Sequence, residues 1–214
     1  MKIFIPIKEF SQRVYRKNFR IFEGEPLYKH SLLKYKNFQV YVDTDSQEIF
    51  EQIKKDSRLS NVEVYKRNKN LVGDKISVCD LIKDFIIKNK IEEPIAQLHV
   101  TSPFLEEKII KEAFKYMKEY DSVVSCNSYQ SRFWRKEKYG LCPINHNPLK
   151  LEQTQDLPTI YEENSAFYIF YPSVILSTGS RIGHNPYFFS ISNPHNIDID
   201  TENDWINAKK ESEK

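Results

Sequence analysis

A short apolar run opens the sequence and stops at a basic segment. Residues 3–7, Ile-Phe-Ile-Pro-Ile, have the composition of a buried strand. The segment after them carries one acid, Glu9, and five cations: Lys8, Arg13, Arg16, Lys17 and Arg20. Open α/β sheets build anion sites where a buried strand ends in such a loop. A solvated basic face is the commoner origin of a charge run, but the position directly after a strand favours a polyphosphate site.

Apolar runs and helical patterns alternate along the rest of the chain, which indicates βαβ units. We expect further strands near residues 39–42, 62–65, 94–100, 122–126, 166–171 and 187–191. We expect helices near residues 26–36, 46–56, 76–88, 105–119 and 202–211, and a short one after Pro172. The sequence therefore predicts an α/β fold with three α/β/α layers and a mainly parallel twisted sheet. No repeat or linker divides it, so residues 1–214 are expected to form one domain.

Composition and charge narrow the class of protein. No apolar run approaches the roughly 20 residues that a membrane span needs, so no membrane partner is expected. The net charge of +2 is too balanced to indicate a nucleic-acid partner. The amino-terminal run has a core pattern rather than the pattern of a signal peptide, which favours a cytoplasmic protein.

The alternating pattern breaks at residues 127–160. Aromatic and basic residues, Arg132 among them, mix in its first part, and a Pro- and Asn-rich passage follows. A surface loop is one interpretation, but loops beyond about 15 residues are uncommon in compact domains and are often functional. Aromatic and arginine side chains are the ones that anchor protein interfaces. The segment is therefore a candidate interface.

Two aspartates alternate with isoleucines near the far end of the chain. On a strand, period two places Asp198 and Asp200 on one face, and Ile197 and Ile199 on the other. Two carboxylates on one face can hold Mg²⁺, which prefers one or two carboxylates together with phosphate oxygens and waters. The competing interpretation is an Asx turn that caps the final helix.

The opening of the chain resembles that of the sugar-acid cytidylyltransferases, most closely the CMP-sialic acid synthetases. Their pattern is Ile-Pro-Ala-Arg-Gly-Gly-Ser-Lys-Gly-x-x-x-Lys-Asn, and here Ile5-Pro6, Ser11 and Lys17-Asn18 match it in register. Lys8 replaces the arginine, and Glu9-Phe10 replace the paired glycines. Without those glycines, fewer backbone N–H groups can approach a phosphate closely. Cationic side chains, Lys8 and Arg13 among them, are expected to compensate.

Further matches follow in the family's order, each near an expected strand end. Leu98-His-Val-Thr-Ser-Pro103 resembles Leu-Gln-Pro-Thr-Ser-Pro, with His99 in place of the glutamine. Asn164-Ser-Ala-Phe-Tyr168 resembles Asn-Gly-Ala-Phe-Tyr, and residues 197–204 resemble Ile-Asp-Ile-Asp-x-x-x-Asp. Arg67 follows the third strand, where the family has an arginine. One short match is weak, but an ordered series that covers nearly the whole chain is specific.

The resemblance implies a role for each matching residue. Lys17 and Asp200 are the implied catalytic residues, Asp198 and Asp200 the implied Mg²⁺ ligands, and Asp204 a structural acid. The implied nucleotide-binding residues are Lys8, Ser11, Arg13, Asn18, Arg67, Thr101 and Ser102. The residues implied to bind the sugar acid are His99, Asn164 and Arg132.

The resemblance also implies a fold and a reaction. The fold is that of the nucleotide-diphospho-sugar transferases, with residues 127–160 as a dimerisation insertion and a homodimer as the assembly. The reaction joins CTP to a nonulosonic, sialic-acid-like sugar acid and gives a CMP-sugar and pyrophosphate. Kdo, an amino-Kdo or a phosphonate is the alternative acceptor, because His99, Leu105 and Ser165 depart from the pattern. A non-catalytic RNA-binding module is the alternative of another class, since aromatics beside cations also suit RNA.

Overall fold

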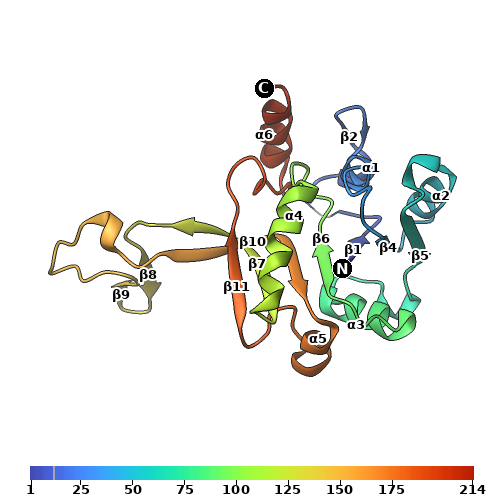
Figure 1. Cartoon of the computed structure of the whole chain (residues 1–214). Coiled ribbons are helices and arrows are strands. Elements are labelled where there is room, and N and C mark those ends of the chain that lie inside the picture. Colours follow the sequence, from blue (N-terminus) through green and yellow to red (C-terminus); the bar gives the residue numbers. More distant parts are fainter. Residues whose placement is uncertain (12) are drawn as a thin grey trace.

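A seven-stranded sheet forms the centre of the computed structural model, which describes residues 1–11 and 13–214 (Figure 1). Its strands lie in the order β11-β7-β10-β6-β1-β4-β5. Among these strands, β10 alone runs antiparallel to its neighbours, so the predicted mainly parallel sheet is confirmed. The strands are β1 (Lys2–Ile7), β4 (Val40–Thr44), β5 (Val62–Lys66), β6 (Ile95–Leu98), β7 (Ser122–Tyr129), β10 (Ile160–Phe170) and β11 (Pro186–Ser190).

Helices cover both faces of this sheet and complete three layers. On β1, Ile3 and Ile5 face one apolar cluster and Phe4 faces another, as the period of a strand requires. The first cluster includes apolar residues of α1 (Leu27–Leu32), α2 (Gln47–Lys55) and α4 (Glu107–Phe114). The second includes those of α3 (Val78–Asn89) and α5 (Pro172–Thr178). The predicted α/β/α arrangement is confirmed.

The last helix brings the end of the chain to its beginning. Helix α6 (Glu202–Ser212) packs on the small β2–β3 hairpin (Ile21–Phe22 and Glu25–Pro26). The rings of Phe22 and Trp205 meet edge to face with centroids 5.9 Å apart, and the Arg20 guanidinium lies 4.2 Å from the Trp205 ring. Because of this packing, the segment before α6 runs beside the basic loop after β1.

Several element bounds differ from expectation. Helix α1 ends at Leu32, and the helix expected at 105–119 divides into α4 and the 3₁₀ helix η4 (Lys115–Lys118). The remaining 3₁₀ turns are η1 (Lys17–Phe19), η2 (Ser57–Leu59), η3 (Lys69–Leu71) and η5 (Thr154–Asp156). Within the described residues, no helix is both long and apolar enough to cross a membrane.

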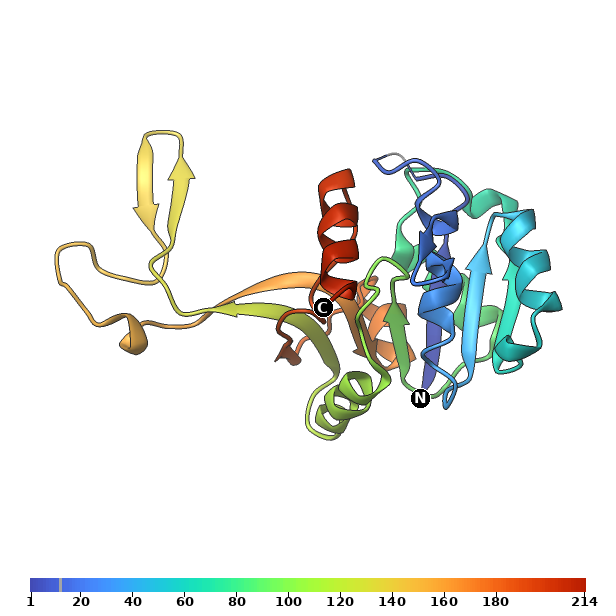
Figure 2. The ribbon, with the colours of Figure 1, turned by 90° about the horizontal axis from the view of Figure 1, so that it is seen from above.

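The segment expected as an insertion forms an arm that projects from the sheet (Figure 2). Its stalk is made by the extended ends of β7 and β10, which stay paired from Cys126 with Glu163 to Tyr129 with Ile160. Beyond the stalk, β8 (Trp134–Glu137) and β9 (Gly140–Pro143) form a two-stranded hairpin. The side chain of Asn145 donates hydrogen bonds to the carbonyls of Ser131 (2.7 Å) and Pro158 (3.0 Å), which ties the two sides of the arm together.

Ser165 takes a left-handed backbone conformation, φ +58°, at an irregularity in β10. The resembled pattern has glycine at this position. An L-residue with this conformation costs roughly 1–2 kcal/mol, whereas glycine adopts it freely but loses more backbone entropy on folding. We expect Ser165→Gly to raise the free energy of unfolding by up to about 1 kcal/mol in urea denaturation.

A matched control for this substitution lies on the paired strand. Ser128 is exposed on β7, and its hydroxyl contacts Ser190 Oγ at 2.8 Å. The hydroxyl of Ser165 likewise makes one contact. Ser128→Gly removes a similar bond without relieving a positive φ, so it should destabilise the protein. Equal losses from both substitutions would show that Ser165 is not strained.

Candidate functional site

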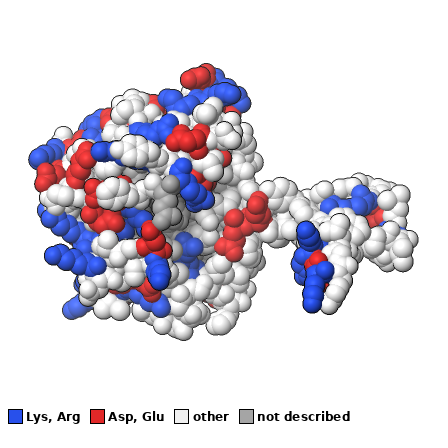
Figure 3. Space-filling model, turned by 180° about the vertical axis from the view of Figure 1, so that it is seen from behind, with Lys and Arg blue, Asp and Glu red and all other residues white. Residues whose placement is uncertain are grey.

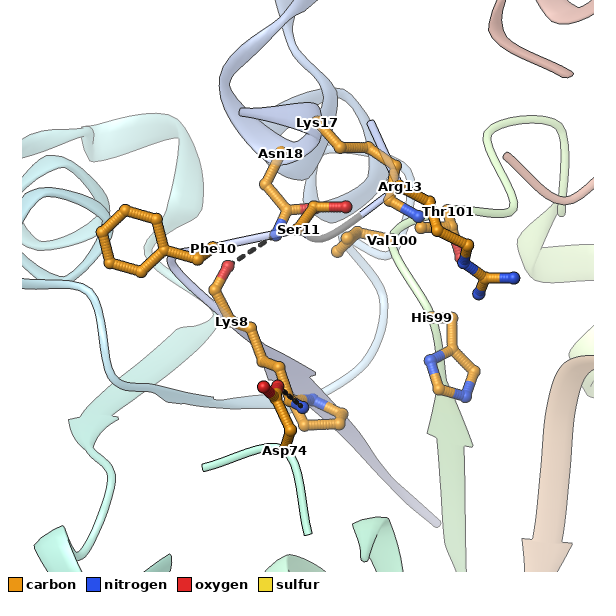
Figure 4. A pocket seen from close by; sticks show the side chains of 11 residues that line it. Lys8, Phe10, Ser11, Arg13, Lys17, Asn18, Asp74, His99, Val100 and Thr101 are labelled. Atoms are coloured by element: carbon orange, nitrogen blue, oxygen red, sulfur yellow. Dashed lines mark hydrogen bonds and ion pairs between the residues drawn. The ribbon is translucent and has the colours of Figure 1, made fainter. Parts of the chain in front are cut away.

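A cleft of about 310 Å³ opens where β1 and β6 reach their carboxyl ends (Figure 4). Seven residues predicted for the site line it, and Pro6, Phe10, Asp74 and Val100 complete its wall. The seven are Lys8, Ser11, Arg13, Lys17, Asn18, His99 and Thr101. Gln12, which replaces a lysine of the resembled pattern, lies outside the described residues. The cleft is at the edge where parallel α/β sheets bind ligands.

Two hydrogen bonds hold the ends of the basic loop. Asn18 is buried, and its side-chain amide donates to the carbonyl of Lys8 at 2.7 Å. The backbone N–H of Glu9 donates to Asp45 Oδ1, also at 2.7 Å. Side chains thus hold the loop in which Glu9 and Phe10 replace the paired glycines of the resembled pattern.

The basic loop contacts the acidic segment near the other end of the chain. Lys17 Nζ donates to the carbonyl of Ile199 at 2.6 Å and lies 3.4 Å from Asp200 Oδ1. Arg13 Nη2 lies 2.9 Å from the same carboxylate oxygen. The Lys17 side chain is only 10% exposed, so its charge is directed at this segment rather than at solvent. Residues 182 positions apart therefore share one site.

Each cation of the basic loop has an acidic partner. Besides the pairs with Asp200, Lys8 lies 3.7 Å from Asp74, Arg16 lies 3.0 Å from Glu48 and Arg20 lies 2.7 Å from Glu202. Arg16 and Arg20 lie outside the cleft lining, and they match the solvated-face interpretation. Lys8, Arg13 and Lys17 line the cleft and match the anion-site interpretation.

The prediction that Asp198 and Asp200 lie on a strand is wrong. Residues 197–200 belong to no strand. The N–H of Ile199 donates to the carbonyl of Thr101 at 2.9 Å, while its own carbonyl accepts from Lys17 instead of a neighbouring strand. The side chain of Ile199 is buried beside Phe22 and Trp205. The alternation in the sequence thus reflects an irregular segment in which the side chain of Ile199 is anchored in the core.

The Asx-turn alternative for this pair does not hold either. Thr201 is the N-cap of α6, and its side chain and that of Asp204 form a reciprocal capping box. Asp204 Oδ2 accepts hydrogen bonds from the N–H groups of Asp200 and Thr201. The structural role expected of Asp204 is confirmed, and the carboxylates of Asp198 and Asp200 are left for another function.

The carboxylate of Asp198 has the properties of an ion ligand. Its Oδ1 atom is buried without a hydrogen-bond partner among the described residues. Burial raises the pKa of this carboxyl above its usual value, while hydrogen bonding by Thr101 opposes the rise. A buried carboxylate oxygen is costly unless something compensates it, and Mg²⁺ binds such oxygens. The described residues contain no cluster of three His, Cys, Asp or Glu side chains suited to a metal, so phosphate and water would supply the other ligands.

Asp198→Asn is expected to stabilise the ligand-free protein. A carboxyl group whose folded-state pKa is raised weakens the fold progressively as pH rises through that pKa. The amide does not titrate, so the gain should be absent below about pH 3.8, where both folded and unfolded carboxyls are protonated. At pH 7 we expect a gain of roughly 0.5–2 kcal/mol in the free energy of unfolding. A pH-independent difference between the two proteins would contradict this.

Arg67 is buried beside the cleft rather than on the surface. Its guanidinium pairs with Asp43 Oδ1, lies 3.4 Å from Asp45 Oδ2 and donates to the carbonyl of Ile7. It lines a hollow of about 240 Å³ with Ile76, Val78 and Leu81. Pro6, Lys8 and His99 border both this hollow and the cleft, so the two adjoin. Arg67 thus lies next to the cleft, and the nucleotide contact expected of it stays a prediction.

His99 directly follows β6 and is neutral at pH 7. Burial lowers the pKa of its imidazole to about 4, and the nearby Arg181 adds to the shift. Its Nε2 atom lies 3.0 Å from the side-chain nitrogen of Gln97. Sequence reasoning missed both Gln97 and Arg181. Gln97 leaves one signal, a polar residue inside an otherwise apolar strand, whereas Arg181 lies in an irregular segment that gives none.

Besides Arg67, Asp198 and Asp200, three predicted residues lie outside the cleft lining. Ser102 is buried, and its hydroxyl has no partner among the described residues. Asn164 donates to Asn127 Oδ1 at 3.1 Å, and that oxygen also accepts from Asn196, just before the acidic segment. Arg132 lies on the arm, where it donates to the carbonyl of Glu152 and to Thr154.

A family model described as cytidylyltransferase matches residues 3–214. The chain belongs to the cytidylyltransferase family. The N-acylneuraminate cytidylyltransferase A of Danio rerio is 29% identical over 177 residues, which cover 80% of this chain and 40% of that protein. The N-acylneuraminate cytidylyltransferase of Streptococcus agalactiae serotype V is 26% identical and covers 95% of this chain and 51% of its own length. The resemblance to sugar-acid cytidylyltransferases is confirmed.

This cytidylyltransferase chain spans about half or less of the length of those two relatives. It matches the pseudaminic acid cytidylyltransferase of Campylobacter jejuni serotype O:23/36 over 93% of that protein, at 26% identity. Among solved structures, a CMP:2-keto-3-deoxy-manno-octonic acid synthetase complexed with CTP superposes with a TM-score of 0.66 at 13% identity. The match covers 98% of this chain and 96% of that one. It supports the three-layer fold of the nucleotide-diphospho-sugar transferases.

Proposed function

We propose that this chain transfers CMP from CTP to a nonulosonic, sialic-acid-like sugar acid, with release of pyrophosphate. The observation that carries the proposal is the meeting of Lys17 and Arg13 with Asp200 beside the cleft, next to the unpartnered oxygen of Asp198. Cations and carboxylates side by side suit a triphosphate with its divalent ion. A cytoplasmic location belongs to the same proposal.

The residues of the cleft would act by position and charge. Lys8, Arg13 and Lys17 would bind the phosphates and stabilise the charge that develops as an anomeric hydroxyl attacks the α-phosphorus. Asp198 and Asp200 would hold Mg²⁺, which would supply Lewis-acid stabilisation of the phosphate oxygens. Asn18 and Asp45 keep the loop in shape through their bonds to the backbone. No side chain is assigned as the general base.

The choice of sugar acid rests on the relatives. Names of matching proteins specify N-acylneuraminate and pseudaminic acid, both nonulosonic acids. Kdo, an amino-Kdo or a phosphonate is the alternative acceptor. Leu105, one of the departures that suggested it, is fully buried in the core, so it removes a family arginine without offering a replacement contact. His99 and Ser165 remain as the departures near the site.

Pyrophosphate release tests the proposal. The protein is incubated with CTP, Mg²⁺ and, in turn, N-acetylneuraminate, pseudaminic acid, Kdo and a phosphonate. The expected result is release with a nonulosonic acid at a kcat/KM at least about tenfold above that with Kdo, equivalent to about 1.4 kcal/mol. Release with Kdo or the phosphonate alone would favour the alternative acceptor. No release with any acid, from protein that binds CTP, would contradict the transferase proposal.

The RNA-binding alternative is disfavoured by the charges. Every cation of the basic loop faces a carboxylate, and Figure 3 shows acidic and basic side chains intermixed on the face of the body that it displays. A surface that binds RNA backbone presents a cationic groove instead. A steep salt dependence of RNA binding, with no affinity for CTP, would revive this alternative.

We propose that the arm forms a homodimer interface. Tyr139, Leu149 and Leu151 are each more than 90% exposed on it, and apolar side chains gathered on a projecting element indicate a protein interface. Most of the arm surface visible in Figure 3 is uncharged. Arg132 lies on this arm, so a dimer could bring it to the sugar site of the partner subunit.

Charges on the arm should break such a dimer. Leu149→Glu with Leu151→Glu adds two negative charges to the exposed apolar segment. We expect at least a hundredfold rise in the dimer dissociation constant in sedimentation, because two buried leucines contribute roughly 3 kcal/mol or more. Lys150→Glu changes the net charge equally at the residue between them and should have a much smaller effect. A wild-type protein that sediments as a monomer at micromolar concentration would contradict the dimer.

A further inference from the structure

Arg181 is a cation without an acidic partner beside the candidate site. It lies between α5 and β11, half-buried, with its guanidinium carbon 3.7 Å from the centre of the Tyr168 ring. Its Nη1 atom donates to Gln97 Oε1. Among the described residues it makes no ion pair, unlike the five cations of the basic loop. A half-buried arginine held by an aromatic ring and an amide has a fixed orientation.

The segment that carries Arg181 is anchored on the end of β7. Asp121 accepts hydrogen bonds from the N–H groups of His184 (2.7 Å) and Asn185 (2.9 Å), and Ser122 Oγ accepts from that of Gly183. The backbone passes so close at Gly183 that a Cβ there would lie 2.2 Å from Asp121 Oδ1. A side chain at position 183 would therefore collide with the Asp121 carboxylate that holds the segment just after Arg181.

Arg181 fixes the orientation of the Gln97 amide. Arginine only donates hydrogen bonds, so the atom of Gln97 that faces Nη1 must be its carbonyl oxygen. The nitrogen of the amide then faces the carbonyl of Leu98 at 3.0 Å and His99 Nε2 at 3.0 Å. Gln97 is fully buried, which leaves no water to satisfy a flipped amide.

The amide in turn fixes the tautomer of His99. A side-chain nitrogen of glutamine only donates, so His99 Nε2 must accept and its proton must be on Nδ1. The Nδ1 atom has no hydrogen-bond partner among the described residues. His99 lines both the cleft and the adjoining hollow, and in Figure 4 it lies across the cleft from Lys8.

We propose that Arg181 is a positioning residue that, through Gln97, holds His99 as a neutral Nδ1–H donor to an acceptor oxygen of the sugar acid. The identity of that ligand rests on the proposed function, while the tautomer does not. This explains why histidine can stand where the family has glutamine, because the locked imidazole offers one N–H to the substrate as an amide would. It also removes His99 Nε2 from any role as general base.

The electrostatic surroundings agree with this geometry. The pKa of His99 is lowered by burial first and by Arg181 second, with Lys17 acting in the same direction and Asp200 opposing. Protonation at Nε2 would place a donor against the donor of Gln97. The neutral form is therefore the one that the surrounding side chains accept.

The tautomer is tested on the wild-type protein by ¹⁵N NMR of the histidine rings, with His99 assigned from the resonance lost in His99→Gln. The expected spectrum at pH 7 has protonated Nδ1 and unprotonated Nε2, and titration falls well below pH 6.5. Arg181→Met should mix the tautomers and raise the titration midpoint by about one pH unit, while Arg181→Lys should keep Nδ1–H. A protonated Nε2 at pH 7 in the wild type would overturn the proposal. Lys210→Met, which removes an exposed cation at the end of α6, is the matched control.

Kinetics test the contact with the ligand. Arg181→Met should raise KM for the sugar acid about tenfold, the effect of one misplaced hydrogen-bond donor, with kcat and the KM for CTP within threefold of wild type. Equal losses for CTP and the sugar acid, or no change in either, would overturn the role of Arg181. If the wild type has no transferase activity, the NMR result still decides the tautomer, so failure of the proposed function and failure of this inference are distinguishable.

Discussion

Asp200→Asn is expected to lower kcat/KM for CMP transfer by about 10³-fold, the scale of losing several kcal/mol of metal and phosphate stabilisation. Asp200 is the carboxylate that both Arg13 and Lys17 contact, and it is 40% exposed beside the cleft. The amide has the same shape but no charge, so it would neither hold Mg²⁺ well nor balance the two cations. The measurement is the rate of pyrophosphate release at varied CTP and Mg²⁺.

The matched control for Asp200→Asn is Glu202→Gln. Glu202 lies two residues further on and pairs with Arg20 on the surface, outside the cleft. Surface pairs of this kind contribute about 0–1 kcal/mol to stability and should contribute nothing to the reaction. An Asp200→Asn protein with activity within threefold of wild type would remove the carboxylate from the mechanism.

Lys17→Met is expected to damage both activity and stability. The ammonium group is the hydrogen-bond donor to the buried carbonyl of Ile199, so its loss leaves that carbonyl unpaired at a cost of about 1–3 kcal/mol. The same change removes a cation from the cleft, for which we expect a loss of at least about 100-fold in kcat/KM. Urea denaturation and initial rates measure the two effects separately.

Two further variants serve as controls for Lys17→Met. Lys210→Met removes an exposed cation and should leave both quantities near wild type. Lys17→Arg keeps the charge, but the guanidinium fork cannot replace a compact ammonium in this buried position, so a partial loss is expected. A Lys17→Met protein that is destabilised yet fully active would show that Lys17 only holds the chain ends together.

Much of the fold could be predicted from the sequence because the patterns that indicate strands and helices lie within short segments. The run 3–7, the apolar stripe of α3 and the alternation of strands with helices determine the three layers. The order of the family motifs also implied that Lys17 and Asp200 share one site, and the structure places Lys17 Nζ 3.4 Å from Asp200 Oδ1.

The errors and omissions have a common physical origin in non-local contacts. Asp198 and Asp200 alternate with apolar residues as on a strand, but period two describes any extended chain, and Lys17 takes the hydrogen bond that a neighbouring strand would need. The arm hairpin has exposed strands with no apolar face to mark them. Gln97 and Arg181 are 84 residues apart, and only folding shows that they meet.

The most direct test of the central claim is thermal unfolding of the wild-type protein with CTP, UTP, ATP and GTP, each with Mg²⁺ and with EDTA. The account predicts that CTP with Mg²⁺ raises Tm well above the shift from the other nucleotides, and that EDTA or Asp200→Asn removes most of that rise, because a ligand stabilises only the state that binds it. Equal shifts from all four nucleotides, or a CTP shift that is indifferent to both EDTA and Asp200→Asn, would contradict a CTP site built from the basic loop and the two aspartates.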